Sequence, residues 1–212
     1  MTNAVPPRLA VIMARTSAEA VVFRRGPSGW FQLIRWDTRH DRVDDGAWIR
    51  GRIYPEKCDL SPDGALLVYS VHQGRRAGTG YTDCWTGISR SPWLTALALW
   101  PMGTTYGGGG RFDDARRVTL RVCAPAAHHP AHPPRGLVVA NGNPPLHAFN
   151  GTRTVDWQGR DQRGRAAFAA RGKLRLGTPA RPGPVLADFN GRVPQPVPAP
   201  DWARRPLTRT RR

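Results

Sequence analysis

A tight turn followed by a short apolar strand recurs along this 212-residue chain, and it restricts the folds that the chain can adopt. The clearest copy is Ser61-Pro62-Asp63-Gly64, followed by an apolar run from Ala65 to Val71. Proline presets φ at the second turn position, serine and aspartate can bond nearby backbone, and glycine accepts a positive φ at the end. A short apolar run bounded by turn residues predicts a β-strand. We therefore predict a β-hairpin over residues 58–69.

The same pattern occurs three more times, at Thr16–Glu19, Asp113–Arg116 and Asp161–Gly164. The turns begin at residues 16, 61, 113 and 161, so the intervals are 45, 52 and 48 residues. A period of about 40–50 residues made of short strands is typical of propeller blades, each a four-stranded antiparallel sheet. We expect an all-β, propeller-like fold of about four short antiparallel blades. The alternative is another all-β fold, a sandwich or a meander, in which the spacing is accidental.

The Ser61–Gly64 turn and the strand after it, which includes Leu66-Leu67-Val68-Tyr69, resemble the blade hairpin of TolB-type and WD-like β-propellers. The close match covers about one blade, and only residues 161–170 repeat both the turn and the strand. The resemblance implies a propeller-like fold. It implies no catalytic residues, because propellers host many functions.

The composition fits a fold with many turns. The chain has 23 glycines and 21 prolines, which favours long irregular loops over long helices. We expect one all-β domain over residues 1–202 and a disordered basic tail over residues 203–212. The N-terminus shows no signal-peptide pattern and no apolar stretch reaches the length of a membrane span, so we expect a soluble cytoplasmic protein.

The charge is strongly positive and uneven. The net charge is +17, of which +5 lies in residues 1–112 and +12 in residues 113–212, and all but two of the 32 basic residues are arginines. Such a field attracts nucleic acid or an acidic protein, although a GC-rich genome would produce the same excess of arginine. The candidate residues for binding nucleic acid or an acidic partner are Arg75, Arg76, Arg204, Arg205, Arg209, Arg211 and Arg212.

The three cysteines, Cys58, Cys84 and Cys123, show neither a disulfide framework nor metal-type spacing. Cys58 and Cys123 fall in or beside predicted strands, so we expect core thiols there. Cys84 follows Asp83 and lies twelve residues after His72, so a Cys/His pair is conceivable. We favour a core thiol at Cys84 as well, because in a single sequence such a pair is indistinguishable from a core thiol beside a surface loop.

Two further motifs have structural interpretations. His128, His129 and His132 lie in an Ala-, His- and Pro-rich segment, 124–135, with no carboxylate or cysteine in the cluster, so we predict an exposed linker and no metal site. The run Gly107–Gly110 fits neither the Rossmann nor the P-loop pattern. We interpret it as a flexible or close-packed turn.

No set of residues predicts catalysis. A hydrolase needs a nucleophile, a base and an orienting group together, and the sequence identifies none. We therefore expect a non-enzymatic interaction module, without cofactor, metal or membrane contact, that binds a protein partner through loops such as Gln73–Thr82 and Pro101–Gly110. The alternative is an arginine-driven nucleic-acid-binding protein, anchored by the tail, whose affinity falls steeply with salt.

Overall fold

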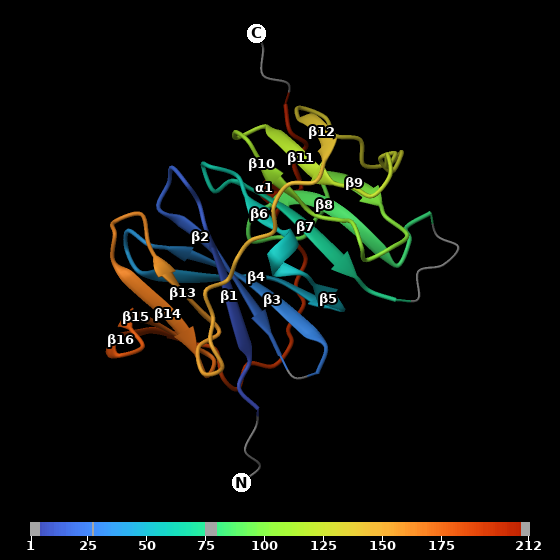
Figure 1. Ribbon diagram of the computed structural model, residues 1–212. Coiled ribbons are helices and arrows are strands. Elements are labelled where there is room, and N and C mark those ends of the chain that lie inside the picture. Colours follow the sequence, from blue (N-terminus) through green and yellow to red (C-terminus); the bar gives the residue numbers. More distant parts are fainter. Residues whose placement is uncertain (1–4, 27, 75–79, 209–212) are drawn as a thin grey trace.

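The computed structural model describes residues 5–26, 28–74 and 80–208, and this part of the chain is all-β, as the sequence predicts (Figure 1). Strands form four sheets, and the helical elements among the described residues are the short 3-10 helix η1 (Pro55–Lys57) and the short helix α1 (Asp201–Arg204). The first sheet is an antiparallel meander of β1 (Arg8–Met13), β2 (Glu19–Arg25), β3 (Trp30–Asp37) and β4 (Arg42–Arg50).

The other sheets follow in chain order. The second contains β5 (Arg52–Ile53), β6 (Asp59–Leu60), β7 (Leu66–His72), β8 (Cys84–Arg90) and β9 (Ala98–Pro101), with β5 and β6 both paired to β7. The third contains β10 (Gly110–Phe112), β11 (Arg117–Arg121) and β12 (Val138–Gly142). The fourth contains β13 (Trp157–Arg160), β14 (Ala166–Ala170), β15 (Lys173–Thr178) and β16 (Arg181–Asp188). The first, second and fourth are antiparallel, whereas β11 and β12 pair in parallel.

Each predicted turn joins two successive antiparallel strands near the start of a sheet. The four pairs are β1 and β2, β6 and β7, β10 and β11, and β13 and β14. In the clearest copy, the Gly64 amide donates to the Ser61 carbonyl at 2.8 Å, and Gly64 has a φ of 78°. In the fourth sheet, the Gly164 amide donates to the Asp161 carbonyl at 2.9 Å, and Gly164 has a φ of 76°. Both turns therefore need glycine at the last position.

Apolar clusters hold the sheets face to face in the order fourth, first, second, third (Figure 1). Val21 and Phe23 of β2 pack toward the second sheet, whereas Val22 between them packs toward the fourth. In β7, Leu67 likewise packs toward the first sheet and Val68 toward the third. Because successive side chains of a strand point to opposite faces, the two inner sheets need strands that are apolar at consecutive positions.

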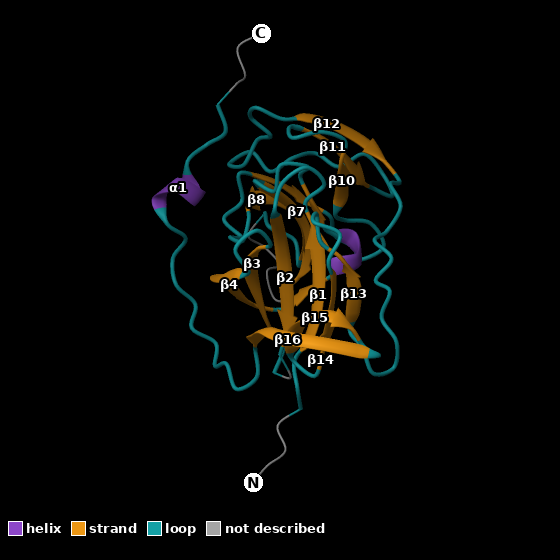
Figure 2. Ribbon diagram, turned by 90° about the vertical axis from the view of Figure 1, so that its left-hand side faces the viewer, coloured by secondary structure: helices purple, strands orange, loops and turns teal. Residues whose placement is uncertain are grey.

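One sequence prediction about a loop is wrong, and a second holds only in part. Residues 203–208, predicted as part of a disordered tail, pack on the domain, because Ala203 and Leu207 are buried and Leu207 joins the cluster between the second and third sheets. Figure 2 shows the segment after β16 running along one side of the stack to α1. Residues 124–135, predicted as an exposed linker, are exposed or half-buried as predicted, but they also cover the edge of β9. The His129 amide donates to the Leu99 carbonyl at 2.7 Å, and the Leu99 amide donates to the His132 carbonyl at 3.1 Å.

Candidate functional site

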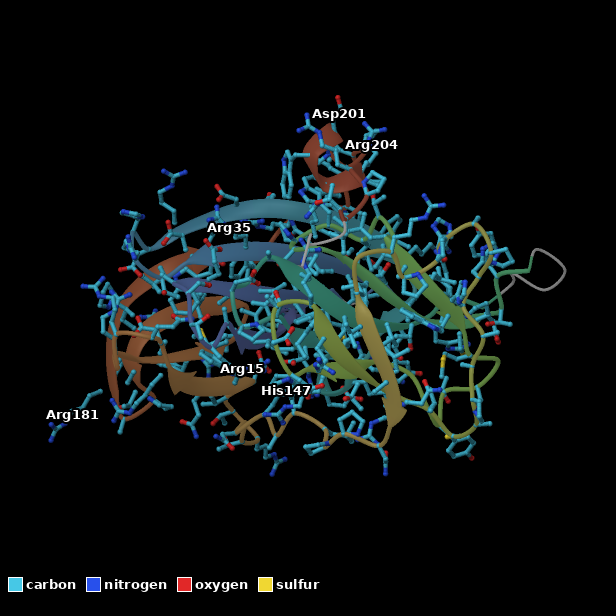
Figure 3. All side chains as sticks on the ribbon, turned by 90° about the horizontal axis from the view of Figure 1, so that it is seen from above. Arg15, Arg35, His147, Arg181, Asp201 and Arg204 are labelled. Atoms are coloured by element: carbon cyan, nitrogen blue, oxygen red, sulfur yellow. The ribbon has the colours of Figure 1, made fainter. Side chains whose placement is uncertain are left out.

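A buried carboxylate lies where β1, β6 and β10, which belong to three different sheets, meet. Asp59, in β6, is 1% exposed and accepts a hydrogen bond from the Phe112 amide of β10 at 2.8 Å. Its oxygens also lie 3.2 Å from Arg15 Nη1 and 2.9 Å from His147 Nε2. Arg15 and His147 point toward the same central region in Figure 3. We call Asp59, Arg15 and His147 the central cluster. A buried charge is tolerated when it is paired and hydrogen-bonded in this way.

The central cluster has a His–Asp pair, but among the described residues no nucleophile is hydrogen-bonded to it. His147 comes from the 143–156 connection between β12 and β13, and its backbone amide donates to the Glu56 carbonyl at 2.8 Å. In the part of the chain that the structure describes, no hydroxyl or thiol is hydrogen-bonded to the His147 ring. A nucleophile–His–Asp relay needs that contact. The geometry therefore fits a structural role, in which the central cluster links the sheets to the 143–156 connection.

A cavity of about 360 Å³ opens beside the central cluster, between β1, β5 and the 143–156 connection. Phe149 lines this cavity and stacks on His147 of the central cluster, with 6.3 Å between the ring centroids. The rest of the wall combines charged side chains with apolar ones, among them Phe23 of β2 and Phe31 of β3. We call this cavity the arginine pocket, because four arginines line it: Arg8, Arg25, Arg52 and Arg153.

The arginine pocket is rich in positive charge. Among the described residues, none of its four guanidinium groups forms an ion pair within 4 Å. Its two acids are Glu56 and Asp156. Burial raises the pKa of Asp156, opposed by a hydrogen bond from the Leu9 amide and by the charge of Arg8. Four cations against two carboxylates favour an anionic ligand.

The predicted basic residues are only partly within the described structure. Arg75, Arg76, Arg209, Arg211 and Arg212 lie outside the described residues. Arg204 pairs with Asp201 of α1 at 3.1 Å. The carbonyl of Arg205 accepts a hydrogen bond from Arg90 Nη2 at 3.1 Å.

Arg205 belongs to a basic group that the sequence did not indicate. Burial and then the charges of Arg116 and Arg205 lower the pKa of Arg90. Within the described part of the chain, Arg90 Nε and Arg116 Nη1 are buried and have no hydrogen-bond partner. We call Arg90, Arg116 and Arg205 the basic cluster. Its members come from β8, from the turn before β11 and from the C-terminal segment, so only the fold brings them together.

The Cys/His pair considered from the sequence does form. His72 and Cys84 are direct cross-strand partners in β7 and β8, and His72 Nε2 lies 3.7 Å from Asp83 Oδ2. Cys84 is buried, as predicted, and burial followed by Asp83 raises the pKa of its thiol. A raised pKa keeps the thiol protonated, so Cys84 is not an activated nucleophile in this arrangement.

The other two cysteines differ from each other. Cys58 is buried, as predicted, and this burial raises the pKa of its thiol. The prediction of a core thiol at Cys123 is wrong, because Cys123 follows the end of β11 and is exposed. A position just after a strand is on the surface whenever the chain leaves the sheet there.

The histidine segment uses two of its rings in contacts with Tyr81. The Tyr81 ring stacks on His129 with a centroid distance of 4.1 Å and an interplanar angle of 14°. The Tyr81 hydroxyl lies 3.1 Å from His132 Nε2. His128 is exposed. These contacts hold the segment over the edge of β9, and they use the rings for packing.

The glycine run is close-packed, which confirms one of its two predicted interpretations. Gly107, Gly108 and Gly109 are buried. A Cβ on Gly109 would lie 1.8 Å from the Lys57 carbonyl oxygen, and the Gly109 amide donates to Thr86 Oγ1 at 2.7 Å. Only the tip of the Pro101–Gly110 loop is strongly exposed, with Tyr106 at 87%. Part of the Gln73–Thr82 loop lies outside the described residues.

Comparisons with protein-family models, curated proteins and solved structures find no match for this chain. Within the described ranges, no helix has the length and apolar character that crossing a membrane requires.

Proposed function

We propose that the chain is a non-enzymatic interaction module with a propeller-like core, and that it binds a protein partner through an acidic segment. The order of the stack supports the propeller-like arrangement. The fourth sheet lies beside the first, the first beside the second and the second beside the third, as successive blades do around a propeller. The turn that recurs near the start of each of the four sheets agrees with an arrangement of four blades.

The observation on which the binding proposal rests is the arginine pocket. Its volume of about 360 Å³ is near the lower end of pockets that hold ligands, and it suits one or two side chains of a partner. Arginine and aromatic residues are enriched at the energetic centres of protein interfaces. Arg25 and Arg52 can form bidentate pairs with carboxylates, while Phe31 and Phe149 contact an apolar side chain. The expected segment therefore combines an apolar residue with flanking Asp or Glu.

A peptide array tests this proposal directly. The array varies the number of acidic residues around one Phe or Leu, and the probe is the full chain at physiological salt. The wild type is compared with Arg25→Glu and Arg52→Glu. Arg181→Glu is a matched control, because Arg181 lies at the start of β16, far from His147 and Arg15 (Figure 3). We expect binding to acidic–apolar peptides that both pocket variants lose and the control keeps. Equal binding by all four proteins would contradict the proposal.

A second function, nucleic-acid binding, is favoured by the basic cluster. Arg90, Arg116 and Arg205 lie close enough together that the charges of the other two lower the pKa of Arg90, and phosphate oxygens are suitable acceptors for guanidinium groups. Labelled single- and double-stranded DNA and RNA, titrated across a salt series, test this function. Arg116→Gln and Arg205→Gln should each weaken binding and reduce the salt slope by about 1, whereas Arg181→Gln should not. Binding that disappears near physiological salt in every protein would contradict it.

A further inference from the structure

We propose that His72, Asp83 and Cys84 form a binding site for one Zn²⁺ ion. The three side chains offer a nitrogen, an oxygen and a sulfur atom that all lie within 4.8 Å of one another. The site shares no residue with the arginine pocket or the basic cluster, although His72 pairs across β5 and β7 with Arg52, which lines the pocket. Its test measures metal binding and does not depend on either proposed function.

Paired backbone positions the three ligands. His72 ends β7 and Cys84 begins β8, and the two residues face each other in the antiparallel register. Directly opposite residues of a sheet have Cβ atoms about 4.5–5.5 Å apart on one face. The Gln73 amide donates to the Asp83 carbonyl at 2.9 Å, which extends the pairing by one step and holds Asp83 beside Cys84. The site is thus built on the ends of two bonded strands.

The three groups do not satisfy one another's bonding capacity. The distance of 3.7 Å between His72 Nε2 and Asp83 Oδ2 is too long for a hydrogen bond. Within the described residues, the His72 ring has no hydrogen-bond partner, and the Asp83 carboxylate interacts only with His72 and the Cys84 thiol. A metal ion would bind all three. Zinc lies about 2.0–2.3 Å from its ligand atoms, so the ligand atoms of a tetrahedral site lie about 3.5 Å from one another. The three ligand atoms here lie within 4.8 Å of one another, so small side-chain rotations that move them by about 1 Å complete the site.

The ligand set selects the class of metal. Thiolate and imidazole suit zinc, whereas magnesium and calcium prefer oxygen ligands alone. Three protein ligands leave the fourth tetrahedral position for water or an external ligand. His72 and Asp83 have side-chain exposures of 40% and 48%, so an ion can enter from solvent, while Cys84 is buried beneath them. Binding displaces the thiol proton of Cys84, which is released to solvent.

Cobalt is the probe for the experiment. Co²⁺ replaces Zn²⁺ in tetrahedral sites, and a thiolate ligand gives a charge-transfer absorption band that colourless Zn²⁺ removes on displacement. We expect the full chain to bind one Co²⁺ with this band, and one Zn²⁺ to abolish it. Cys84→Ser should eliminate the band. His72→Gln and Asp83→Asn should weaken binding by at least about tenfold each.

Two matched variants exclude other sites. Cys123→Ser removes the exposed thiol, and His129→Gln removes a ring from the histidine segment; both should retain the band and the affinity. His72→Gln keeps the proposal testable even if Cys84→Ser fails to fold, because His72 is partly exposed at the end of its strand. Absence of the band in the wild type, its loss in Cys123→Ser, or unchanged affinity in His72→Gln and Asp83→Asn would each overturn the proposal.

Discussion

His147 Nε2 lies 2.9 Å from Asp59 Oδ1, across 88 residues of sequence. This contact attaches the connection between the third and fourth sheets to an inner strand of the second. Arg15 pairs with the other oxygen of the same carboxylate and also donates to the Phe112 carbonyl, so one buried group joins three sheets and the connection. Phe149 stacks on His147 and lines the arginine pocket. The pocket's shape therefore depends on Asp59.

Replacing Asp59 by alanine should destabilise the fold strongly. The variant leaves the Phe112 amide without an acceptor and removes the charge that Arg15 and His147 face. Breaking a buried pair costs about 3–5 kcal/mol, and the partial exposure of Arg15 and His147 places the expected loss near the lower limit, about 3 kcal/mol. Urea unfolding of the variant and the wild type gives this difference.

Asp201→Ala is the control for that measurement. Asp201 also pairs with an arginine, Arg204, but its side chain is 87% exposed. Exposed pairs contribute about 0–1 kcal/mol, so the control should unfold close to the wild type. Comparable losses in the two variants would mean that the central cluster contributes no more than a surface ion pair.

Gly109→Ala should be one of the most damaging glycine substitutions. The new Cβ would lie 1.8 Å from the Lys57 carbonyl, and the φ of 75° is unfavourable for alanine. Overpacking costs about 1–3 kcal/mol and the left-handed conformation about 1–2 kcal/mol. Gly103→Ala separates the two effects, because Gly103 has a φ of 64° but nothing within 4 Å of its Cβ position. Denaturant unfolding should show a loss for Gly103→Ala of about 1 kcal/mol and a clearly larger loss for Gly109→Ala. Equal losses would show that the backbone at Gly109 moves away from Lys57.

Local chemistry explains which parts of the fold were predictable. The turns at Ser61 and Asp161 are determined within about six residues of the chain, by a glycine with positive φ and by a side chain that accepts a hydrogen bond from a nearby amide. Ser61 Oγ accepts from the Leu66 amide, and Asp161 Oδ1 accepts from the Arg165 amide, both at 2.9 Å. Such information is present in one sequence, and the strands that follow could be placed from it.

The functional sites depend on contacts that no local pattern contains. Arg8 and Arg153 line one pocket only because the connection after β12 returns to β1. Cys84 and His72 were considered as a pair because they are close in sequence, yet only the register of β7 and β8 makes them direct partners. The parallel pairing of β11 and β12 does not follow from the sequence either. The turn pattern predicts an antiparallel hairpin of β10 and β11, and it carries no information about which strand pairs with the other edge of β11.

Leu207→Ala should show that the C-terminal segment is part of the fold. Leu207 is 5% exposed and packs with Val118 and Leu120 between the second and third sheets. Truncating a buried leucine to alanine costs about 2–5 kcal/mol, and we expect the low end for a residue near the chain terminus, about 2 kcal/mol. Val197→Ala is the matched control, because Val197 is 58% exposed. Thermal unfolding should separate the two. An unchanged Tm for Leu207→Ala would favour the disordered tail that composition suggested.

Stability should fall in acid, and Asp37 should account for part of the loss. A hydrogen bond from His40 Nδ1 at 2.7 Å, aided by the amides of Arg39 and His40, lowers the pKa of Asp37 from 3.8 to about 2. Since the folded state holds the charged form more strongly than the unfolded state does, this stability is present above the unfolded pKa, near pH 4. It disappears as the pH falls through about 2.

Asp37→Asn tests this pH dependence, because asparagine retains an acceptor for the two amides but does not titrate. Urea unfolding at pH 5 and again near pH 2.5 gives the change in unfolding free energy for each protein. The wild type should lose more stability between the two pH values than Asp37→Asn does. Asp63→Asn, at the third position of the Ser61–Gly64 turn, is a carboxylate control that should follow the wild type. An equal acid loss in Asp37→Asn and the wild type would place the titrating group elsewhere, with Asp41 as the next candidate because Arg165 lowers its pKa.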